Sequence, residues 1–376
     1  MIRYAWQIKN DTTAVEWTSS VLSFSLSNRR KSYLETYNAG SLTLTIKNQN
    51  NEAAGFTIND RIGLHRPDGI LLLFFWVLEV SYTDFPGNVG MSTATIVCQD
   101  GFGRIGRVLM DNYSISAGTT AVQFEALQSA PGYKAYNPEL AAPVGAGSTA
   151  SASPTTTGSI LNYVNLLVNT ERGMIGCVSN RLAFVSRNYL GSITAGATTI
   201  GRLPGASQIG YSSFERINLG LDFMNQVQVQ PAGLATQSAT NAESVATYGA
   251  SGFSVSTVDA TEVQALGLAN WLVNLLSDQT KQRFIVEFTD VMQSMTVATF
   301  DEIAANSFGA MPYTLTYRVP GAGSDTSVNV VLEGCDISAT PSQTTVRWYL
   351  TPLTYYDFFT LDSATLGILD TSRLGW

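Results

Sequence analysis

Charged residues are scarce in this chain. Asp, Glu, Lys and Arg make up 13% of its 376 residues, and 21 Lys and Arg against 29 Asp and Glu leave a net charge of −8. A surface that grips nucleic acid needs clustered Lys and Arg to displace counterions. The only dense basic stretch is Arg29-Arg30-Lys31, and three charges after a strand usually lie in a solvated turn. The composition therefore disfavours a nucleic-acid-binding protein.

Cysteine and histidine are also scarce, which limits the chemistry that side chains can perform. The three cysteines, Cys98, Cys177 and Cys335, have no CxxC spacing, so we expect three small buried residues rather than disulfides or a zinc site. His65 would have to carry any Ser-His-Asp triad or His-based metal centre alone. Its place before Arg66-Pro67 indicates a surface or strand-end residue. We therefore predict no catalytic residue, no cofactor and no metal ligand.

The chain has no apolar segment long enough to cross a membrane. Its N-terminus, MIRYAWQIKNDTT, lacks the apolar core of a signal peptide. The longest apolar run, Ile70–Leu78, is about half the length that a bilayer requires, and we interpret it as a strand buried on both faces. These absences predict a protein without a membrane span, made and kept in a cytosol unless it leaves by another route such as cell lysis.

Short alternating strands dominate the pattern that is present. Strict alternation within residues 1–112 predicts strands at Val21–Ser27, Ser41–Lys47 and Ser92–Cys98, and turn clusters between them suggest a small barrel or sandwich. Further extended segments are predicted at Met174–Val178, Arg181–Arg187, Phe214–Val229, Arg283–Phe288, Tyr313–Val319, Ser327–Leu332 and Thr344–Leu350.

Helical patterns are confined to the middle of the chain. Thr119–Ala130 predicts a short helix, and Gly158–Thr170 predicts an amphipathic helix that Gly173 can cap. Between them, residues 140–158 are rich in Ala, Gly, Ser, Thr and Pro, and we interpret them as a mobile loop or linker.

A longer helix is predicted at Thr261–Ser277. Asp259, with Glu262 three residues later, forms a capping-box signature at its start. With strands before and after these helices, the predicted fold class is α+β and β-rich.

Two patterns resemble catalytic motifs, but neither has the context that its chemistry needs. Gly101–Gly106 matches G-x-G-x-x-G, yet barely a turn of helix can follow it, so we interpret its glycines as turn residues. Carboxylates such as Glu287 with Asp290, or Asp301 with Glu302, would have to face one another across a sugar-binding cleft. Nothing in the sequence places such a pair, so we predict that the protein is not an enzyme.

Aromatic residues gather near the C-terminus instead. Tyr355, Tyr356, Phe358 and Phe359 lie at the start of an extended tail that contains Leu374 and ends in Trp376. Aromatic side chains bury large areas at low entropic cost and are enriched at subunit interfaces. An assembly interface formed by these six residues is one interpretation, and packing in the chain's own core is the other.

Several short motifs occur along the chain in the order that one protein family shows. Ala39–Asn48 (AGSLTLTIKN) stands where the family has an AGT(A)TLTLDN strand. Gln99–Arg104 stands at the family's closing turn, and Thr170–Gly173 with Phe184–Arg187 at a helix end and hairpin. The ending LGILDTSRLGW completes the order, whereas Asn112–Thr156 carries no family motif. Taken together, these motifs resemble those of the minor tail or baseplate-hub proteins of long-tailed bacteriophages, including the T4-type hub.

The resemblance implies a structural virion protein, a trimeric hub at the distal end of a phage tail that adapts the sixfold tail tube to a threefold tip. It implies two tube-like β-barrel or sandwich domains with two smaller α+β insertions. The implied boundaries are 1–112 and 208–235 with 283–354 for the tube-like domains, 113–207 and 236–282 for the insertions, and 355–376 for an extended tail.

The same resemblance implies the partners. They are two further copies of the chain, the tail tube or distal tail protein ring, the tape measure protein and tip fibre or spike proteins, assembled in the host bacterial cytoplasm. DNA would pass through the lumen without specific binding. We hypothesise that the acidic excess lines this lumen, because like charge keeps phosphates from binding.

Two other functions stay open. A host-surface carbohydrate-binding adhesin of the tail tip would also be rich in Gly and aromatic residues, and it predicts exposed aromatic platforms. A tail-associated cell-wall hydrolase predicts lysis of peptidoglycan that a single carboxylate substitution abolishes. The hub predicts ring assembly with tail-tube neighbours and neither activity.

Overall fold

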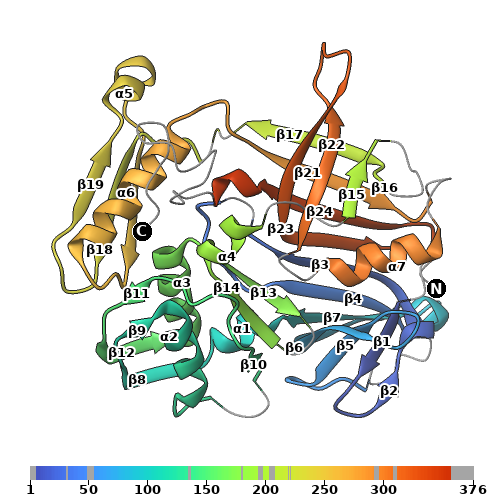
Figure 1. Cartoon of the computed structure of the whole chain (residues 1–376). Coiled ribbons are helices and arrows are strands. Elements are labelled where there is room, and N and C mark those ends of the chain that lie inside the picture. The colour runs from blue at the N-terminus through green and yellow to red at the C-terminus, as the bar shows by residue number, and fades with distance from the viewer. Residues whose placement is uncertain are drawn as a thin grey trace.

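A computed structural model shows one long, curled sheet running through much of the molecule (Figure 1). Fourteen strands of the described part of the chain belong to it, and the predicted β-rich α+β class is confirmed. The structure describes residues 6–30, 33–48, 55–133, 137–178, 181–193, 198–202, 208–218, 220, 222–291, 296–307 and 311–356.

The first β unit begins the sheet. Its strands form where apolar residues alternate, so that Leu42, Leu44 and Ile46 of β4 are all buried. The first half of β6 is buried on both faces, as expected for the longest apolar run. The strands of this unit are β1 (Gln7–Asn10), β2 (Val15–Glu16), β3 (Val21–Arg29), β4 (Ser41–Lys47), β5 (Arg61–His65), β6 (Leu71–Thr83) and β7 (Thr93–Gln99).

The second β unit lies near the C-terminal end of the sequence. Its helix α7 (Val297–Asn306), which the sequence analysis did not predict, buries Phe300 and Ile303 in the same core as Trp348. Ser307 at the end of this helix accepts a hydrogen bond of 2.8 Å from the Trp348 indole. The strands are β15 (Thr198–Gly201), β16 (Gln208–Gly210), β17 (Ser213–Asn218), β21 (Gln282–Thr289), β22 (Pro312–Arg318), β23 (Asp325–Ala339) and β24 (Thr344–Pro352).

The two β units repeat one arrangement of five antiparallel strands. β3, β4, β7, β6 and β5 pair in this order, and β17, β21, β24, β23 and β22 pair in the same order. Trp76 is the last residue of β6 that pairs with both β5 and β7, and Val331 is the last residue of β23 that pairs with both β22 and β24. Two residues later each strand has a register shift, at Leu78 and at Glu333. Residues of the two units can therefore be matched one by one.

A smaller α+β region follows the first unit. Residues 140–158 are only in part the loop that we expected. Residues 141–148 belong to no strand of a sheet, but β11 pairs with β9, β12 pairs with β8, and the Gln123 amide donates to the Ser151 carbonyl at 2.7 Å. Arg172, at φ 52°, ends α3 instead of Gly173. The elements are α1 (Gly101–Ile105), β8 (Leu109–Ile115), β9 (Gly118–Thr119), α2 (Thr120–Ala126), β10 (Glu139–Leu140), β11 (Thr149–Ala150), β12 (Ser153–Ser159), α3 (Ile160–Glu171), β13 (Met174–Val178), β14 (Arg181–Val185) and α4 (Arg187–Ser192).

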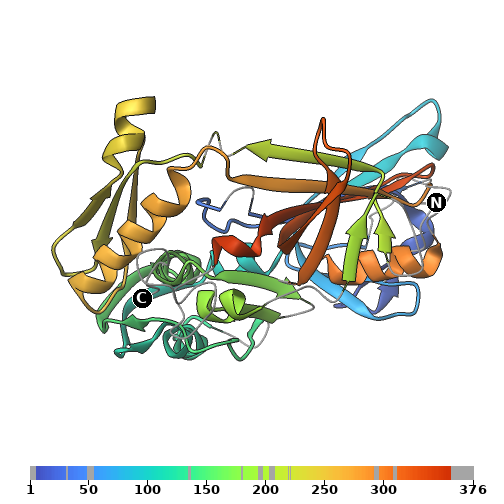
Figure 2. The ribbon, with the colours of Figure 1, turned by 45° about the horizontal axis from the view of Figure 1, so that its top comes forward.

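A three-stranded sheet covered by a long helix forms the last unit, and it stands beside the long sheet (Figure 2). The extended segment Phe214–Val229 contains two strands of different sheets, since β18 pairs with β19 and β20. Thr261 caps the long helix by accepting from the Gln264 amide at 3.2 Å, whereas Asp259 accepts from the Thr257 hydroxyl. The elements are β18 (Gln226–Pro231), β19 (Gln237–Thr240), α5 (Ala242–Tyr248), β20 (Gly252–Thr257) and α6 (Glu262–Leu276).

Candidate functional site

The two β units meet at one pair of strands. β3 and β23 pair antiparallel from Phe24 opposite Ala339 to Arg29 opposite Gly334, and we call this pair the joint. It joins the units into a run of eight antiparallel strands in the order β17, β21, β24, β23, β3, β4, β7 and β6. The chain therefore presents one continuous sheet surface across both units.

One face of this eight-stranded run is buried, and the other consists largely of hydroxyl side chains. The register places residues that alternate with the core residues side by side across neighbouring strands. We call this surface the hydroxyl face. Its Ser and Thr residues in the strands around the joint are Ser23, Ser25, Ser27, Ser41, Thr43, Thr45, Ser81, Thr83, Thr93, Thr95, Ser338 and Thr345.

Charges on the hydroxyl face are few and largely compensate one another. Arg347 forms an ion pair of 2.9 Å with Glu287, and Asp336 accepts from the Tyr349 hydroxyl at 2.8 Å. An open hollow of about 420 Å³ around them is lined in part by Ser25 and Ser41. The other described charged residues of this face are Lys47, Glu79, Glu215 and Arg283. Acids and bases therefore nearly balance on it.

A buried ion pair lies at the joint. Glu333 occupies the register shift of β23, and its carboxylate accepts from Arg30 Nε at 2.8 Å and from the Tyr356 hydroxyl at 2.7 Å. Burial is the largest single influence and disfavours the charged guanidinium, but Glu333 together with Tyr37, Tyr356 and Tyr33 outweighs it and holds the pKa of Arg30 well above its usual value. The guanidinium also lies over the ring of Tyr37, 4.9 Å from its centroid. Arg30 is thus fully paired inside the protein.

Burial of Arg30 corrects the interpretation of the basic stretch as a solvated turn. Its side chain is 1% exposed, because a carboxylate from the other end of the sequence compensates its charge. No local signal predicts this, since Glu333 follows an apolar segment of β23 that resembles any core strand.

Of the six residues predicted to form an assembly interface, the structure describes two. Tyr355 and Tyr356 are 1% and 0% exposed, within the core cluster that also contains Tyr33 and Trp271. The Tyr355 hydroxyl donates to the Gln282 carbonyl at 2.8 Å. Both tyrosines therefore pack in the chain's own core, the second of our two interpretations. Phe358, Phe359, Leu374 and Trp376 lie outside the described residues.

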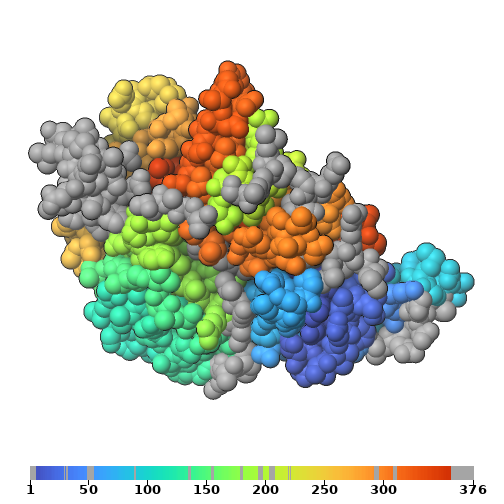
Figure 3. All heavy atoms as spheres, turned by 45° about the vertical axis from the view of Figure 1, so that its right-hand side comes forward, coloured from blue at the N-terminus to red at the C-terminus, as the bar shows by residue number. Residues whose placement is uncertain are grey.

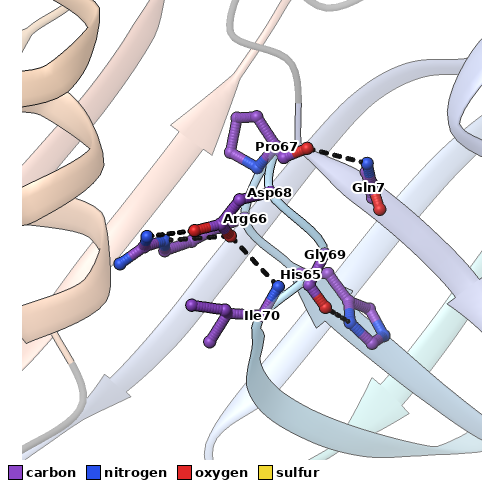
Figure 4. Close-up of polar contacts among 7 residues, drawn as sticks. All are labelled: Gln7, His65, Arg66, Pro67, Asp68, Gly69 and Ile70. Atoms are coloured by element: carbon purple, nitrogen blue, oxygen red, sulfur yellow. Dashed lines mark hydrogen bonds and ion pairs between the residues drawn. The ribbon is translucent and has the colours of Figure 1, made fainter.

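His65 ends β5 and is buried, so it is a strand-end residue and not a surface residue. Its Nδ1 contacts the Gly69 carbonyl at 3.1 Å within a turn whose polar groups bond to one another (Figure 4). In the same turn Asp68 pairs with Arg66 and accepts from the Ile70 amide at 3.1 Å. The position of His65 is that of a structural residue that closes the β5–β6 hairpin.

The remaining candidate motifs have structural partners. Gly101 and Gly103 lie in the five-residue helix α1, which Asp100 caps, whereas Gly106 lies in the turn that follows it, as predicted. Such a short helix cannot serve a dinucleotide. Glu287 is engaged by Arg347, and Asp290 accepts from the Thr344 amide at 2.9 Å. Asp301 and Glu302 lie on α7 rather than on a strand.

All three cysteines are buried and free, as predicted. Burial raises the pKa of the Cys98 thiol, which disfavours a reactive thiolate. In the part of the chain that is described, no group of three or more His, Cys, Asp or Glu residues is placed to hold a metal ion. No helix among these residues is long and apolar enough to span a bilayer.

Two edges of the eight-stranded run carry no further strand among the described residues. One belongs to β17, which pairs only with β21. The other belongs to the second half of β6, beyond the segment that β5 covers. The β6–β7 hairpin and the β22–β23 hairpin both project from the surface (Figure 3). The edges and hairpins are the parts of this sheet that a neighbouring molecule can reach.

The fold is shared with tail proteins of bacteriophages. It is similar to the 43 kDa tail protein of prophage MuSo2 from Shewanella oneidensis, with a TM-score of 0.59 and 10% identity over 94% of this chain and 99% of that one. For the tail protein from Neisseria meningitidis MC58 the TM-score is 0.58, with 10% identity over 92% and 96% of the two chains.

A third similar structure comes from a secretion system. The E. coli c3393 protein is described as a component of the type VI secretion system with structural similarity to the T4 bacteriophage tail proteins gp27 and gp5. Its TM-score is 0.52, with 7% identity over 94% of this chain and 76% of that one. At these identities the similarities establish the fold. No protein-family model and no curated protein matches the sequence.

Proposed function

We propose that this chain is a non-enzymatic, structural subunit of a phage tail, a trimeric hub whose copies close into a ring around a channel for DNA. The observation that carries the proposal is the repeat of one five-strand arrangement within a single chain. Three copies supply six such units, so a threefold ring of this chain can stack on a sixfold tube.

The hydroxyl face suits the wall of the channel. Phosphates bind where Lys and Arg cluster, and this face carries hydroxyls with nearly balanced charges. The acidic excess of the whole chain is not concentrated on it, so we revise the proposed mechanism from repulsion by acids to the lack of attractive charge. DNA would slide past such a wall without specific binding.

Further parts of the proposal concern position and partners. The ring would lie at the distal end of the tail and contact the tail tube or distal tail ring, the tape measure protein and the tip fibre or spike proteins. The virion tail would be its final location, after assembly in the host bacterial cytoplasm. The fold similarity to the tail protein of prophage MuSo2 and to the tail protein from Neisseria meningitidis supports the location in a tail.

Mass and symmetry of the purified chain test the proposal. We expect light scattering or native mass spectrometry to give three times the 40.5 kDa of one chain, alone or with the tail-tube protein, and electron microscopy to show a threefold ring. A chain that stays monomeric with the tail-tube protein overturns the proposal. Glycan binding by the isolated chain would favour the adhesin, and peptidoglycan lysis would favour the hydrolase.

A further inference from the structure

Among the described residues, the internal repeat leaves two complementary edges without a further strand, and we infer that copies of this chain join through them. The edge of β6 in one copy pairs with the edge of β17 in the next, in the register that β23 and β3 use at the joint. The inference rests on the proposed ring and deepens it, since it names the strands and residues that close the ring.

The equivalence of positions follows from the strand pairs. In each unit, four residues that pair directly, one from each of four neighbouring strands, form a row across the sheet. The row begins on the strand with the register shift, β6 or β23, and ends on the first strand of the repeat, β3 or β17. The row in the first unit is Val77, Cys98, Leu42 and Leu26; the row in the second unit is Leu332, Leu350, Phe284 and Arg216. β6 therefore corresponds to β23, and β17 corresponds to β3.

This equivalence fixes the register between two copies. At the joint Asp336 pairs with Ser27, and Ser338 pairs with Ser25. The equivalent pairs are Ser81 with Ile217 and Thr83 with Glu215. In both pairs the residues belong to the hydroxyl face, so pairing in this register continues that face from one copy into the next.

The ion pair at the joint determines which edges pair. Glu333 at the register shift of β23 needs Arg30, which directly follows β3. At the equivalent positions β6 has Leu78, and the residue that follows β17 at the place of Arg30 is Gly220. A β23 edge on β17 would bury Glu333 without a cation, and a β6 edge on β3 would do the same to Arg30. Apart from the joint itself, only β6 with β17 avoids burying Glu333 or Arg30 without its partner.

Crosslinking of the full-length chain tests the register. In a Ser81→Cys, Ile217→Cys variant, directly opposed residues lie within reach of a short thiol-specific crosslinker, so we expect covalent dimers and trimers on denaturing gels. The native cysteines are buried in the described structure and serve as an internal background. A Ser27→Cys, Asp336→Cys variant is the positive control, because this pair should crosslink within one chain.

The matched negative control moves one cysteine along the same strand. In a Ser81→Cys, Ser213→Cys variant the second cysteine is four residues out of register, about 13 Å away, and should give no intermolecular product. A second test uses the unmodified chain: the backbone amides of residues 213–218 should exchange hydrogen more slowly after assembly than before it.

The outcomes separate the inference from the proposed function. A threefold ring in which Ser81→Cys, Ile217→Cys gives no product, or in which residues 213–218 exchange as fast as in the monomer, overturns the inference and leaves the hub intact. A chain that forms no ring with its tail-tube neighbour overturns the hub, and the inference with it.

Discussion

Arg30 and Glu333 are 303 residues apart in the sequence, and their side chains form a buried ion pair of 2.6 Å where the two β units meet. A buried pair of this kind is weak as a source of net stability, because both ions lose their hydration. The pair instead determines which strands can be neighbours, because each buried charge requires the opposite charge of its partner. The pair therefore holds β3 on β23 and disfavours every alternative neighbour that lacks the opposite charge.

Removal of one partner should cost much more than removal of both. Arg30→Met leaves Glu333 buried without a cation, and we expect a loss of about 3–5 kcal/mol in the free energy of unfolding. Adding Glu333→Leu should recover most of that loss, because no buried charge remains. Urea denaturation of the full chain measures both values.

An exposed ion pair provides the control for this experiment. Arg181 and Glu139 have side chains that are 62% and 49% exposed, so Arg181→Met should change the free energy of unfolding by no more than about 1 kcal/mol. Equal losses for Arg30→Met and Arg181→Met would contradict the role that we assign to the joint.

The neighbouring tyrosines give a second, graded prediction. Tyr356 donates to the carboxylate of Glu333 at 2.7 Å, whereas Tyr355 donates to a backbone carbonyl at 2.8 Å. Hydrogen bonds to charged groups are the stronger kind, so Tyr356→Phe should cost about 1.5–3 kcal/mol and Tyr355→Phe about 0.5–1.5 kcal/mol. Denaturation curves that rank the two variants in the opposite order would refute this reasoning.

Strands with strict alternation could be predicted from the sequence, and the joint could not. β4 begins and ends at the predicted residues, because its alternation records one buried and one half-exposed face. Arg30 looked solvated because its partner is distant, and burial of a charge depends on what another segment supplies. The repeat of the two units was also hidden, since it lies in strand pairing rather than in residue identity.

Composition is a poor guide to structure where side chains carry little periodic signal. Residues 140–158 contain small and hydroxyl residues, yet part of this segment pairs with β8 and β9. The cap of α6 was assigned to Asp259, two residues too early, because Thr261 and Asp259 are both favourable cap residues and only geometry separates them. Such choices depend on tertiary contacts.

Stability should depend on pH through Asp100. Burial raises the pKa of this carboxyl to about 6, and one of its oxygens caps α1 by accepting from the Gly103 amide. The folded state therefore binds the proton more tightly than the unfolded state, so the stabilising effect of protonation is complete below about pH 4 and is lost as the pH rises through about 6. The difference amounts to at most about 3 kcal/mol.

Asp100→Asn keeps the cap and removes the titration, so the fall in stability between pH 4 and 6 should become shallower. Asp259, whose pKa burial also raises to about 6, should respond in the same direction in Asp259→Asn. Unfolding by urea across this pH range measures both variants. An unchanged slope in both would show that neither carboxyl titrates as the structure indicates.

The last prediction concerns DNA binding and follows from the nearly balanced charges of the hydroxyl face. Ser25 and Ser41 are exposed on this face, next to the hollow at the joint. Ser25→Lys with Ser41→Lys should give the assembled ring an affinity for DNA that falls steeply with salt, because each lysine releases counterions from the phosphates. Ala242→Lys with Ala246→Lys adds the same charge to the exposed helix α5, away from the sheet, and should leave DNA binding unchanged. Fluorescence anisotropy of a labelled duplex at several salt concentrations measures both. Tight binding by the unmodified ring, or equal binding by the two double variants, would exclude the hydroxyl face as the channel wall.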